Sequence, residues 1–493
     1  MIESTQMKPA SRTLIFATLL FYGSLVIAPH KIAVFLFTFC YFFILWRLMR
    51  HFRLALMTLY LTLIPILVGK LFDIDLISGK ELGIPGRDFG IAADIVITIS
   101  DITVALMGVL LVGASLRKES FNRQYPFLEL ILFLYAVGTV VATLMGSVRP
   151  DISIVHSVFA LKPLILYYFF SLQPTLRPAV VISVFTAGLF FELGIVMGQV
   201  LKGGSIGLVI ETIGNYIVID RSLDAAGLLR YGGTYMHANA LAHAMLIPFC
   251  FSVSALFYSY GKKDRLIFSG FFAGLIVVIL TMSRSVWLSV VFGLSVFFIF
   301  TRFVWRYKLK LIIVLTLAQR SVLVGVIVVL GILMMPRLVS TLYSGGLYGS
   351  IETRSMLLKE YTQSLSTNLM AGVGLEMDVY MQYLRASHFG SRNIDAPNRS
   401  VLLYFPEPVH NGFLRLLIQV GLIGAVPYYL LVFSLGYVLY RKLLRVTSVM
   451  HRFFGASLMA AYIAMIVNGF MQPILPDMPV LTALVMIYLS DSV

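Results

Sequence analysis

The sequence has few charged residues and almost no cysteine. Of its 493 residues, 12% are charged and only Cys40 and Cys250 are cysteines. Soluble domains carry about 25% charged residues, so this composition excludes an ordinary water-soluble domain. Both cysteines lie in apolar stretches, which argues against a disulfide framework or a thiol–metal site. Hydrophobic residues, in contrast, make up 59% of the chain, and lipid is the solvent that suits them.

Long apolar segments fill most of the chain. A helix needs about 20 apolar residues to cross about 30 Å of hydrocarbon, and none of the segments alternates apolar and polar residues as a barrel strand does. We predict an all-α polytopic membrane protein of about 14 transmembrane helices. The spans are placed at about 13–29, 32–46, 54–69, 91–116, 126–146, 154–171, 179–201, 238–259, 266–282, 285–304, 311–335, 412–440, 453–471 and 477–490. The first span has no small-residue cleavage site, which indicates an uncleaved helix rather than a signal peptide.

The net charge of +15 is concentrated in short gaps between spans. The clusters are Arg47/Arg50/Arg53, Arg117/Lys118/Arg123, Lys262/Lys263/Arg265, Arg302/Arg306/Lys308/Lys310 and Arg441/Lys442/Arg445/Arg452. They occur at every second gap, which is the positive-inside pattern and predicts both termini in the cytoplasm. These charges set topology and contact anionic lipid headgroups; they do not indicate a nucleic-acid partner.

The outward gaps are unequal in length, and they divide the chain. We expect N-terminal transmembrane helices over 1–201, a periplasmic loop over 202–237, transmembrane helices over 238–335, a large periplasmic loop over 336–411 and C-terminal transmembrane helices over 412–493. A loop of this length is rarely structureless unless it is functional or disordered, and its aromatic and aliphatic content argues against disorder. Within it, residues 351–366 predict an amphipathic helix, with Leu357, Tyr361 and Leu365 on one stripe.

His410 and Asn411 stand where the large loop meets an apolar helix. The helix start offers free N–H groups and a positive dipole end to an anion, and Pro406 and Pro408 stiffen the approach. The alternative is a structural histidine that is hydrogen-bonded to a nearby carbonyl. We interpret His410 and Asn411 as catalytic because a titratable imidazole at the membrane surface has to be useful to be kept there.

Arginines in three other outward segments are candidates for binding a phosphorylated lipid. They are Arg230, Arg284 and Arg354, and their planar guanidinium groups bond phosphate oxygens in pairs. Asn239 and Arg415 are possible additional members of the site. The alternatives are an Arg230 that snorkels to headgroups, an exposed Arg354–Glu352 ion pair, and an Arg415 that binds a headgroup.

The remaining polar residues give a weaker signal. Acidic residues of the outward loops are scattered without the spacing of metal ligands, so no metal site and no cofactor is predicted. Asp94 and Asp101, seven apart on one expected helix face, lie near Lys162 and Glu192 in neighbouring spans. Mutual pairing inside the bundle explains these four better than function does.

The stretch HNGFLRLLIQVGLIG (410–424) resembles the signature of the O-antigen ligase and polymerase superfamily. That signature is a histidine, then Asn, Ser or Gln, nine residues, a glycine, two residues and a second glycine. RYGGTYMHANALA (230–242), TMSRSVW (281–287) and Arg354 followed by AGVG (371–374) resemble three other segments of the family, in the same order. The resemblance covers about 230–430.

The resemblance implies a membrane glycosyltransferase of the C type, working without metal and with inversion, whose donor is a glycan on undecaprenyl diphosphate. His410 would orient or deprotonate the acceptor hydroxyl, and Arg230, Arg284 and Arg354 would bind the diphosphate. The acceptor is another glycan in a polymerase, a lipid A core in a ligase and a serine in protein-glycosylating relatives, and the sequence does not separate these. The alternative function is a transporter or flippase for the same lipid; a third, less favoured, is a structural scaffold.

Overall fold

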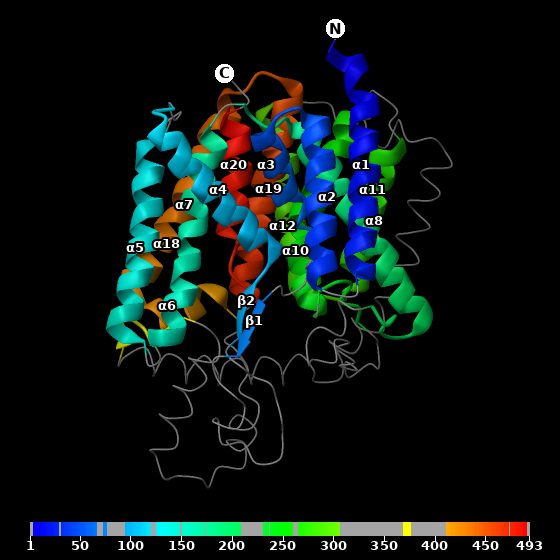
Figure 1. Ribbon diagram of the computed structural model, residues 1–493. Helices are drawn as coiled ribbons and strands as arrows, with labels where there is room; N and C mark the ends of the chain where they lie inside the picture. Colours follow the sequence, from blue (N-terminus) through cyan, green and yellow to red (C-terminus); the bar gives the residue numbers. More distant parts are fainter. Residues whose placement is uncertain are drawn as a thin grey trace, which may run out of the picture.

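The computed structural model describes thirteen stretches of the chain. They are residues 3–28, 31–66, 72–75, 94–119, 125–147, 150–172, 174–208, 230–235, 237–259, 265–305, 368–375, 411–472 and 474–490. They form a bundle of helices that run up and down between two ends, with both termini at the same end (Figure 1). We call this the basic end, and the opposite one, where the β1–β2 hairpin lies, the loop end.

Helices account for nearly all of the described structure. In the first half of the chain these are α1 (Glu3–Ile27), α2 (Lys31–Met49), α3 (Phe52–Thr62), α4 (Ile99–Leu116), α5 (Pro126–Gly146), α6 (Pro150–Val158), the 3₁₀ turn η1 (Phe159–Leu161), α7 (Lys162–Ser171) and α8 (Pro178–Lys202). In the second half they are α10 (Ala238–Ser259), α11 (Arg265–Leu280), α12 (Arg284–Ile299), the π-turn η3 (Phe300–Val304), α18 (Gly412–Arg445), α19 (Val449–Met471) and α20 (Met478–Ser490). Strands β1 (Phe72–Asp75) and β2 (Asp94–Ile97) pair antiparallel.

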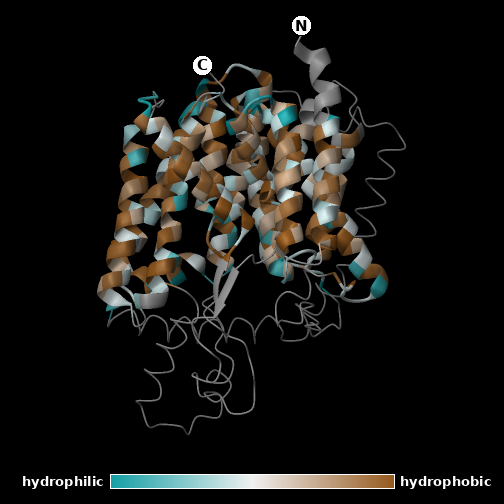
Figure 2. Ribbon diagram, in the orientation of Figure 1, coloured by the Kyte–Doolittle hydropathy of each residue, from teal (hydrophilic) through white to brown (hydrophobic). Residues whose placement is uncertain are grey.

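The helices are apolar along their length and polar at their ends, as Figure 2 shows. Eight stretches of described helix are long and apolar enough to cross a membrane: Ile32–Met49, Ile99–Leu116, Pro126–Gly146, Ser153–Ser171, Pro178–Lys202, Arg284–Arg302, Gly412–Arg445 and Val449–Met471. Large apolar side chains such as Leu20 and Phe433 are more than 70% exposed, which lipid tolerates and water does not. The chain is therefore a polytopic helical membrane protein. The prediction of about 14 spans stays a prediction, since 311–335 lies outside the described residues.

The described basic clusters gather at the basic end. Arg47 lies in the last turn of α2, Arg117 follows α4, and Lys442 and Arg445 end α18. These helix ends are brought to one side by the alternating directions of the helices (Figure 1). The sequence prediction that these clusters share one side agrees with this arrangement.

Two expected spans are wrong in part. The span at 54–69 stops at Thr62, and the one at 91–116 begins at Ile99, because residues 94–97 pair with β1. Asp94 therefore faces Asp75 in the hairpin and does not share a helix face with Asp101. The expected span at 154–171 agrees with the apolar stretch Ser153–Ser171, although η1 interrupts its α-helix; Lys162 and then Pro163, which has no N–H to donate, follow η1.

Helix α18 is broken by the backbone of another segment. Gly421 has φ +56° and ψ −166°, a conformation that is open to glycine alone. The N–H groups of Val373 and Gly374 donate to the carbonyls of Ile418 and Gln419, at 3.0 and 2.9 Å. In return, Leu422 and Ile423 donate to Leu369 and Met370, at 2.9 and 3.0 Å. Residues 368–375, which we call the inserted segment, thus satisfy the backbone groups that the break leaves open.

Candidate functional site

Residues 230–235 are held against α8 by two polar side chains that were not expected to act together. Gln199 donates from Nε2 to the Gly233 carbonyl at 2.9 Å and accepts the Gly233 N–H at 3.0 Å. Glu192 accepts from the N–H of Thr234 at 3.1 Å and also from its hydroxyl. A Cβ on Gly233, whose φ is +59°, would lie 2.2 Å from Glu192 Oε2. The paired glycines therefore let this segment approach α8 closely.

Tyr235 fixes the other end of the segment. Its hydroxyl donates to the Ile64 carbonyl at 2.8 Å, just beyond the end of α3. Desolvation raises the pKa of the Tyr235 phenol well above its ordinary value, and the Glu192 and Asp477 carboxylates raise it further. The phenol therefore stays protonated and remains a donor at neutral pH.

Arg230 joins two of the motif segments. Its side chain is buried. Nη2 donates to Asn239 Oδ1 at 2.5 Å, and Nε donates to the Thr281 carbonyl at 3.2 Å. Asn239 is the second residue of α10, and Thr281 begins the turn between α11 and α12. The structure thus brings Arg230 and Asn239 together, and it fixes both beside the turn that leads to Arg284.

Arg284 is the first residue of α12. The turn before it is three residues long, 281–283, as the sequence predicts, and Met282 adopts φ +52° there. The Arg284 side chain is exposed, while Ser283 and Ser285 on either side are buried. The turn therefore holds the Arg284 side chain at the surface, between two buried serines.

Asn411 begins α18 as its N-cap. Its side-chain oxygen accepts from the Leu414 N–H at 3.0 Å, which satisfies one of the free donors of the first turn. Arg415 lies one turn into the helix and is half-buried. His410 and Arg354 lie outside the described residues, so their predicted roles are not tested by the structure.

Gln472, at the end of α19, links the starts of α12 and α18. Its Nε2 donates to the Ser285 hydroxyl at 2.8 Å, and its carbonyl accepts the Gly412 N–H at 2.9 Å. A Cβ on Gly412 would lie 2.9 Å from the Ile474 carbonyl oxygen, so this approach is also a close one. Gln472 was not among the predicted site residues; its signal in the sequence is a polar residue directly before Pro473 at the end of an apolar run.

Three helix N-termini meet through these contacts. The starts of α10, α12 and α18 are connected by Arg230, Thr281, Ser285 and Gln472 at the loop end. First-turn N–H groups lack partners within their own helix and carry partial positive charge. Together with Arg230 and Arg284, they make this part of the loop end suited to bind an anion.

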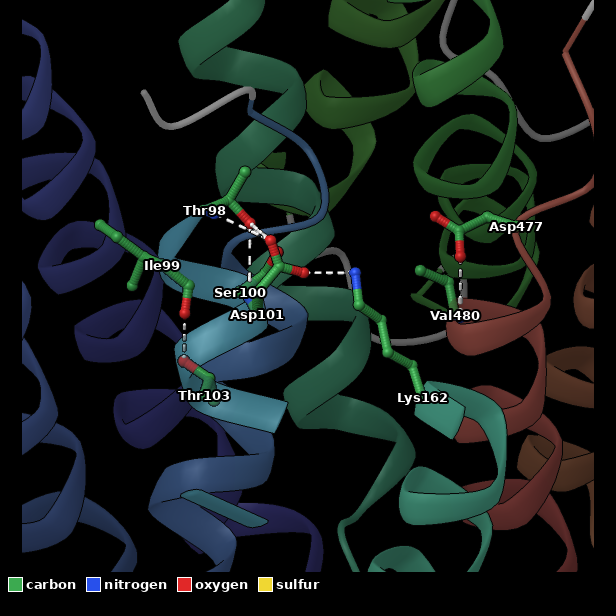
Figure 3. Close-up of polar contacts among 8 residues, drawn as sticks. All are labelled: Thr98, Ile99, Ser100, Asp101, Thr103, Lys162, Asp477 and Val480. Carbon is green, nitrogen blue, oxygen red and sulfur yellow. Dashed lines mark hydrogen bonds and ion pairs between the residues drawn. The ribbon is translucent and has the colours of Figure 1, made fainter. Parts of the chain in front are cut away.

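A second group of polar residues lies at the starts of α4, α7 and α20 (Figure 3). Asp101 closes a capping box with Thr98 at the start of α4 and also pairs with Lys162 at the start of α7. Asp477 caps α20 by accepting the Val480 N–H at 3.1 Å, and the charges of Lys162 and Asp101 both act on it. The predicted pairing is therefore right for Asp101 and Lys162 and wrong for Glu192, which bonds Thr234.

This group lies within the depth of the bundle. Helix α20 has 13 residues, or about 20 Å of length, and it ends at the basic end. Its start therefore lies about 20 Å from that end, among the packed helices. Asp477 is nevertheless exposed, and the side chains of Asp101 and Lys162 are 12% and 24% exposed. Non-helical backbone among packed helices is stable where it is buried in protein or lines water.

Metal ligands are not clustered in the part of the chain that the structure describes. No group of three His, Cys, Asp or Glu residues there is placed to hold an ion. Most of the large loop lies outside that part, so the prediction of no metal site stays a prediction.

Comparison with known families finds a match over about a third of the chain. Residues 269–429 match the family model described as O-antigen ligase. This match confirms the resemblance inferred from the motifs, and it contains Arg284, Arg354, His410, Asn411 and Arg415. Arg230 and Asn239 precede it and are joined to it by the Arg230–Thr281 hydrogen bond. No protein of curated function matches the chain.

Proposed function

We propose, on the premise that residues 269–429 match the O-antigen ligase family, that the protein is a membrane glycosyltransferase that moves a glycan from undecaprenyl diphosphate to an acceptor hydroxyl. The observation that carries the proposal is the junction of Arg230, Asn239 and the turn before Arg284 at the helix starts of the loop end. A diphosphate has the charge and the oxygens that such a junction recognises.

In the proposed reaction, the acceptor hydroxyl oxygen attacks the anomeric carbon of the donor sugar. The bond from that carbon to the diphosphate oxygen breaks, and undecaprenyl diphosphate leaves with the electron pair. His410 takes the hydroxyl proton, with Asn411 beside it. Arg230, Arg284 and Arg354 stabilise the charge that develops on the leaving diphosphate, with Arg415 and Asn239 as possible additional contacts. No step in this scheme needs a metal ion, and the attack from the opposite face inverts the anomeric carbon.

The proposed location is the bacterial inner membrane, in the assembly of O-antigen, exopolysaccharide or another surface polysaccharide. The loop end faces the periplasm and the basic end the cytoplasm, because basic residues favour the cytoplasmic side. The acceptor would be a second lipid-linked glycan or a lipid A core. The alternative, a transporter of the same lipid, is less favoured because it needs no histidine in the outer loop.

A single-turnover assay tests the proposal. Purified wild-type protein and His410→Ala would be given a defined undecaprenyl-diphosphate glycan in EDTA, and the released lipid and lengthened glycan would be measured. We expect transfer by the wild type and a loss of about 10²–10⁴-fold in the variant, the usual contribution of general-base catalysis. Transfer only after a lipid A core is added would make the protein a ligase. Equal transfer by both proteins would contradict the proposed role of His410.

A further inference from the structure

A cavity at the basic end has a lining that no step of the proposed reaction uses. It has a volume of about 770 Å³ and lies between the start of α5, the end of α18 and the start of α19. The lining consists of Tyr125, Pro126, Phe127, Leu128, Tyr437, Val438, Arg441, Lys442, Arg445, Val446, Thr447, Ser448 and His451. Among the described residues, this lining contains two arginines, a lysine and no carboxylate. We propose that this cavity binds the phosphate group of an anionic phospholipid.

The cations are arranged on one short stretch of helix. Arg441 and Arg445 are one turn apart in the last two turns of α18, with Lys442 between them. Arg441 is oriented by its neighbour, because Nη1 donates to the Tyr437 hydroxyl at 2.8 Å and the guanidinium lies over that ring at 5.6 Å. A guanidinium held in this way keeps further N–H donors for phosphate oxygens.

Two helix starts add to the positive potential. Helix α5 begins with Pro126 after Tyr125, and α19 begins after Ser448; all three of these residues line the cavity. Neither N-cap side chain accepts a backbone N–H of its own helix, although the Ser448 hydroxyl bonds His451 Nδ1 at 3.1 Å. The partial positive charges of both helix starts therefore face the space into which the three cations project.

The surroundings of the cavity favour a lipid over a free phosphate. Exposed apolar side chains continue from it along both flanking helices, at Phe127, Leu130 and Leu134 on α5 and at Leu430, Phe433 and Tyr437 on α18. Spacings of three and four residues place each set on one helix stripe. Helices α5 and α18 pack closely, since a Cβ on Gly138 would lie 2.6 Å from the Ile423 carbonyl oxygen. The two stripes thus offer a path for acyl chains below a basic headgroup site.

Positive charge at this end has a simpler explanation, which a matched variant separates from the proposal. Cations at cytoplasmic helix ends set topology and attract anionic lipid over the whole surface. Arg47, Arg117 and Arg302 are exposed at the same end and do not line the cavity. Neutralising these three changes the net charge by the same amount as neutralising Arg441, Lys442 and Arg445.

The test measures lipid retention by native mass spectrometry together with the thermal unfolding midpoint. Full-length protein in detergent would be given phosphatidylglycerol, phosphatidylcholine or inorganic phosphate. For wild type and for Arg47→Gln/Arg117→Gln/Arg302→Gln, we expect retention and stabilisation by phosphatidylglycerol alone. Arg441→Gln/Lys442→Gln/Arg445→Gln should bind it roughly 100-fold more weakly, and Arg445→Gln alone roughly fivefold. The single variant keeps the test usable if the triple variant does not fold.

Two results would overturn the proposal. Equal losses in the two triple variants would assign the binding to general surface charge. Stabilisation by inorganic phosphate as strong as that by phosphatidylglycerol would make the cavity a site for a soluble anion.

Discussion

The two ends of the helix bundle both carry arginines, but the arginines are held differently. At the basic end, Arg117 is two-thirds exposed, and its nearest carboxylate oxygen, of Glu119, is 3.8 Å away. At the loop end, Arg230 is buried and bonded to two elements that the chain separates by 42 residues, Asn239 and Thr281. Charge alone orients a membrane protein, whereas charge in fixed geometry recognises a ligand. The fixed geometry of Arg230 supports its proposed role in binding the diphosphate, whereas the exposed Arg117 needs only a topological role.

The largest loss of stability is expected from a substitution where the inserted segment meets α18, in the half of the bundle nearer the loop end. In Gly421→Ala, the added Cβ would lie 2.3 Å from the Met370 carbonyl oxygen, at a φ of +56°. Backbone strain alone costs about 1–3 kcal/mol, and the overlap with Met370 adds to it. We expect little folded protein by size-exclusion chromatography and a much lower thermal midpoint. Gly194→Ala in α8 is the control, since nothing lies within 4 Å of its added Cβ. Equal stability of the two variants would contradict the docking of the inserted segment.

Exchanging one arginine at each end tests the comparison directly. Arg230→Gln should lower single-turnover transfer by about 10²–10³-fold, the usual effect of losing one preorganised donor to a developing oxyanion. Arg117→Gln should stay within about twofold of wild type, because an exposed ion pair contributes at most about 1 kcal/mol. Comparable losses in both variants, with unchanged folding, would remove the distinction between the two ends.

The ion pair between Asp101 and Lys162 gives a third contrast. Lys162→Met leaves Asp101 and Asp477 close together without their cation, and we expect a loss near the lower limit of about 3–5 kcal/mol because the pair is partly exposed. Arg177→Met, an exposed cation directly before α8, should change stability by less than about 0.5 kcal/mol. Chemical unfolding of both variants measures the difference. Adding Asp101→Asn to Lys162→Met should restore part of the loss, and no recovery would argue against a direct pair.

The smallest loss of stability is expected from breaking the hydrogen bond that links α12 to α18 through Gln472. Gln472→Ala and Ser285→Ala should each cost about 1 kcal/mol, and the double variant should cost less than the sum, because both remove one hydrogen bond. Unfolding measurements on the double-mutant cycle give the coupling. Strict additivity would show that the two side chains act separately.

Hydropathy predicted the spans where apolar runs coincide with uninterrupted helices. The expected spans at 126–146 and 238–259 agree with α5 and α10. It failed where a tertiary contact replaces helical hydrogen bonds, as at β2, whose apolar residues pair with β1, and at Gly421, where the apolar run continues through the break. The spacing of apolar residues along α18 does not show that the backbone of another segment will be inserted into this helix.

The sequence motifs predicted which residues of the candidate site lie together, but they did not predict the side chains that hold those residues in place. Arg230, Asn239 and the turn before Arg284 do come together, as the shared outward position of their segments suggested. The positioning residues Gln199, Glu192 and Gln472 lie outside every motif, and their partners are set by close packing around Gly233 and Gly412. Such contacts depend on how closely two backbones approach each other in three dimensions, which a sequence does not express.

The inserted segment also has a consequence for how the protein changes over evolutionary time. Gly372 and Gly421 face one another so closely that a Cβ on Gly372 would lie 2.6 Å from the Gly421 nitrogen, and one on Gly421 would lie 2.5 Å from the Ala371 nitrogen. Neither position can acquire a side chain while the other half of the contact persists. The two sites, 49 residues apart in the chain, are thus inherited as a single unit, and lineages should keep both glycines or lose both together.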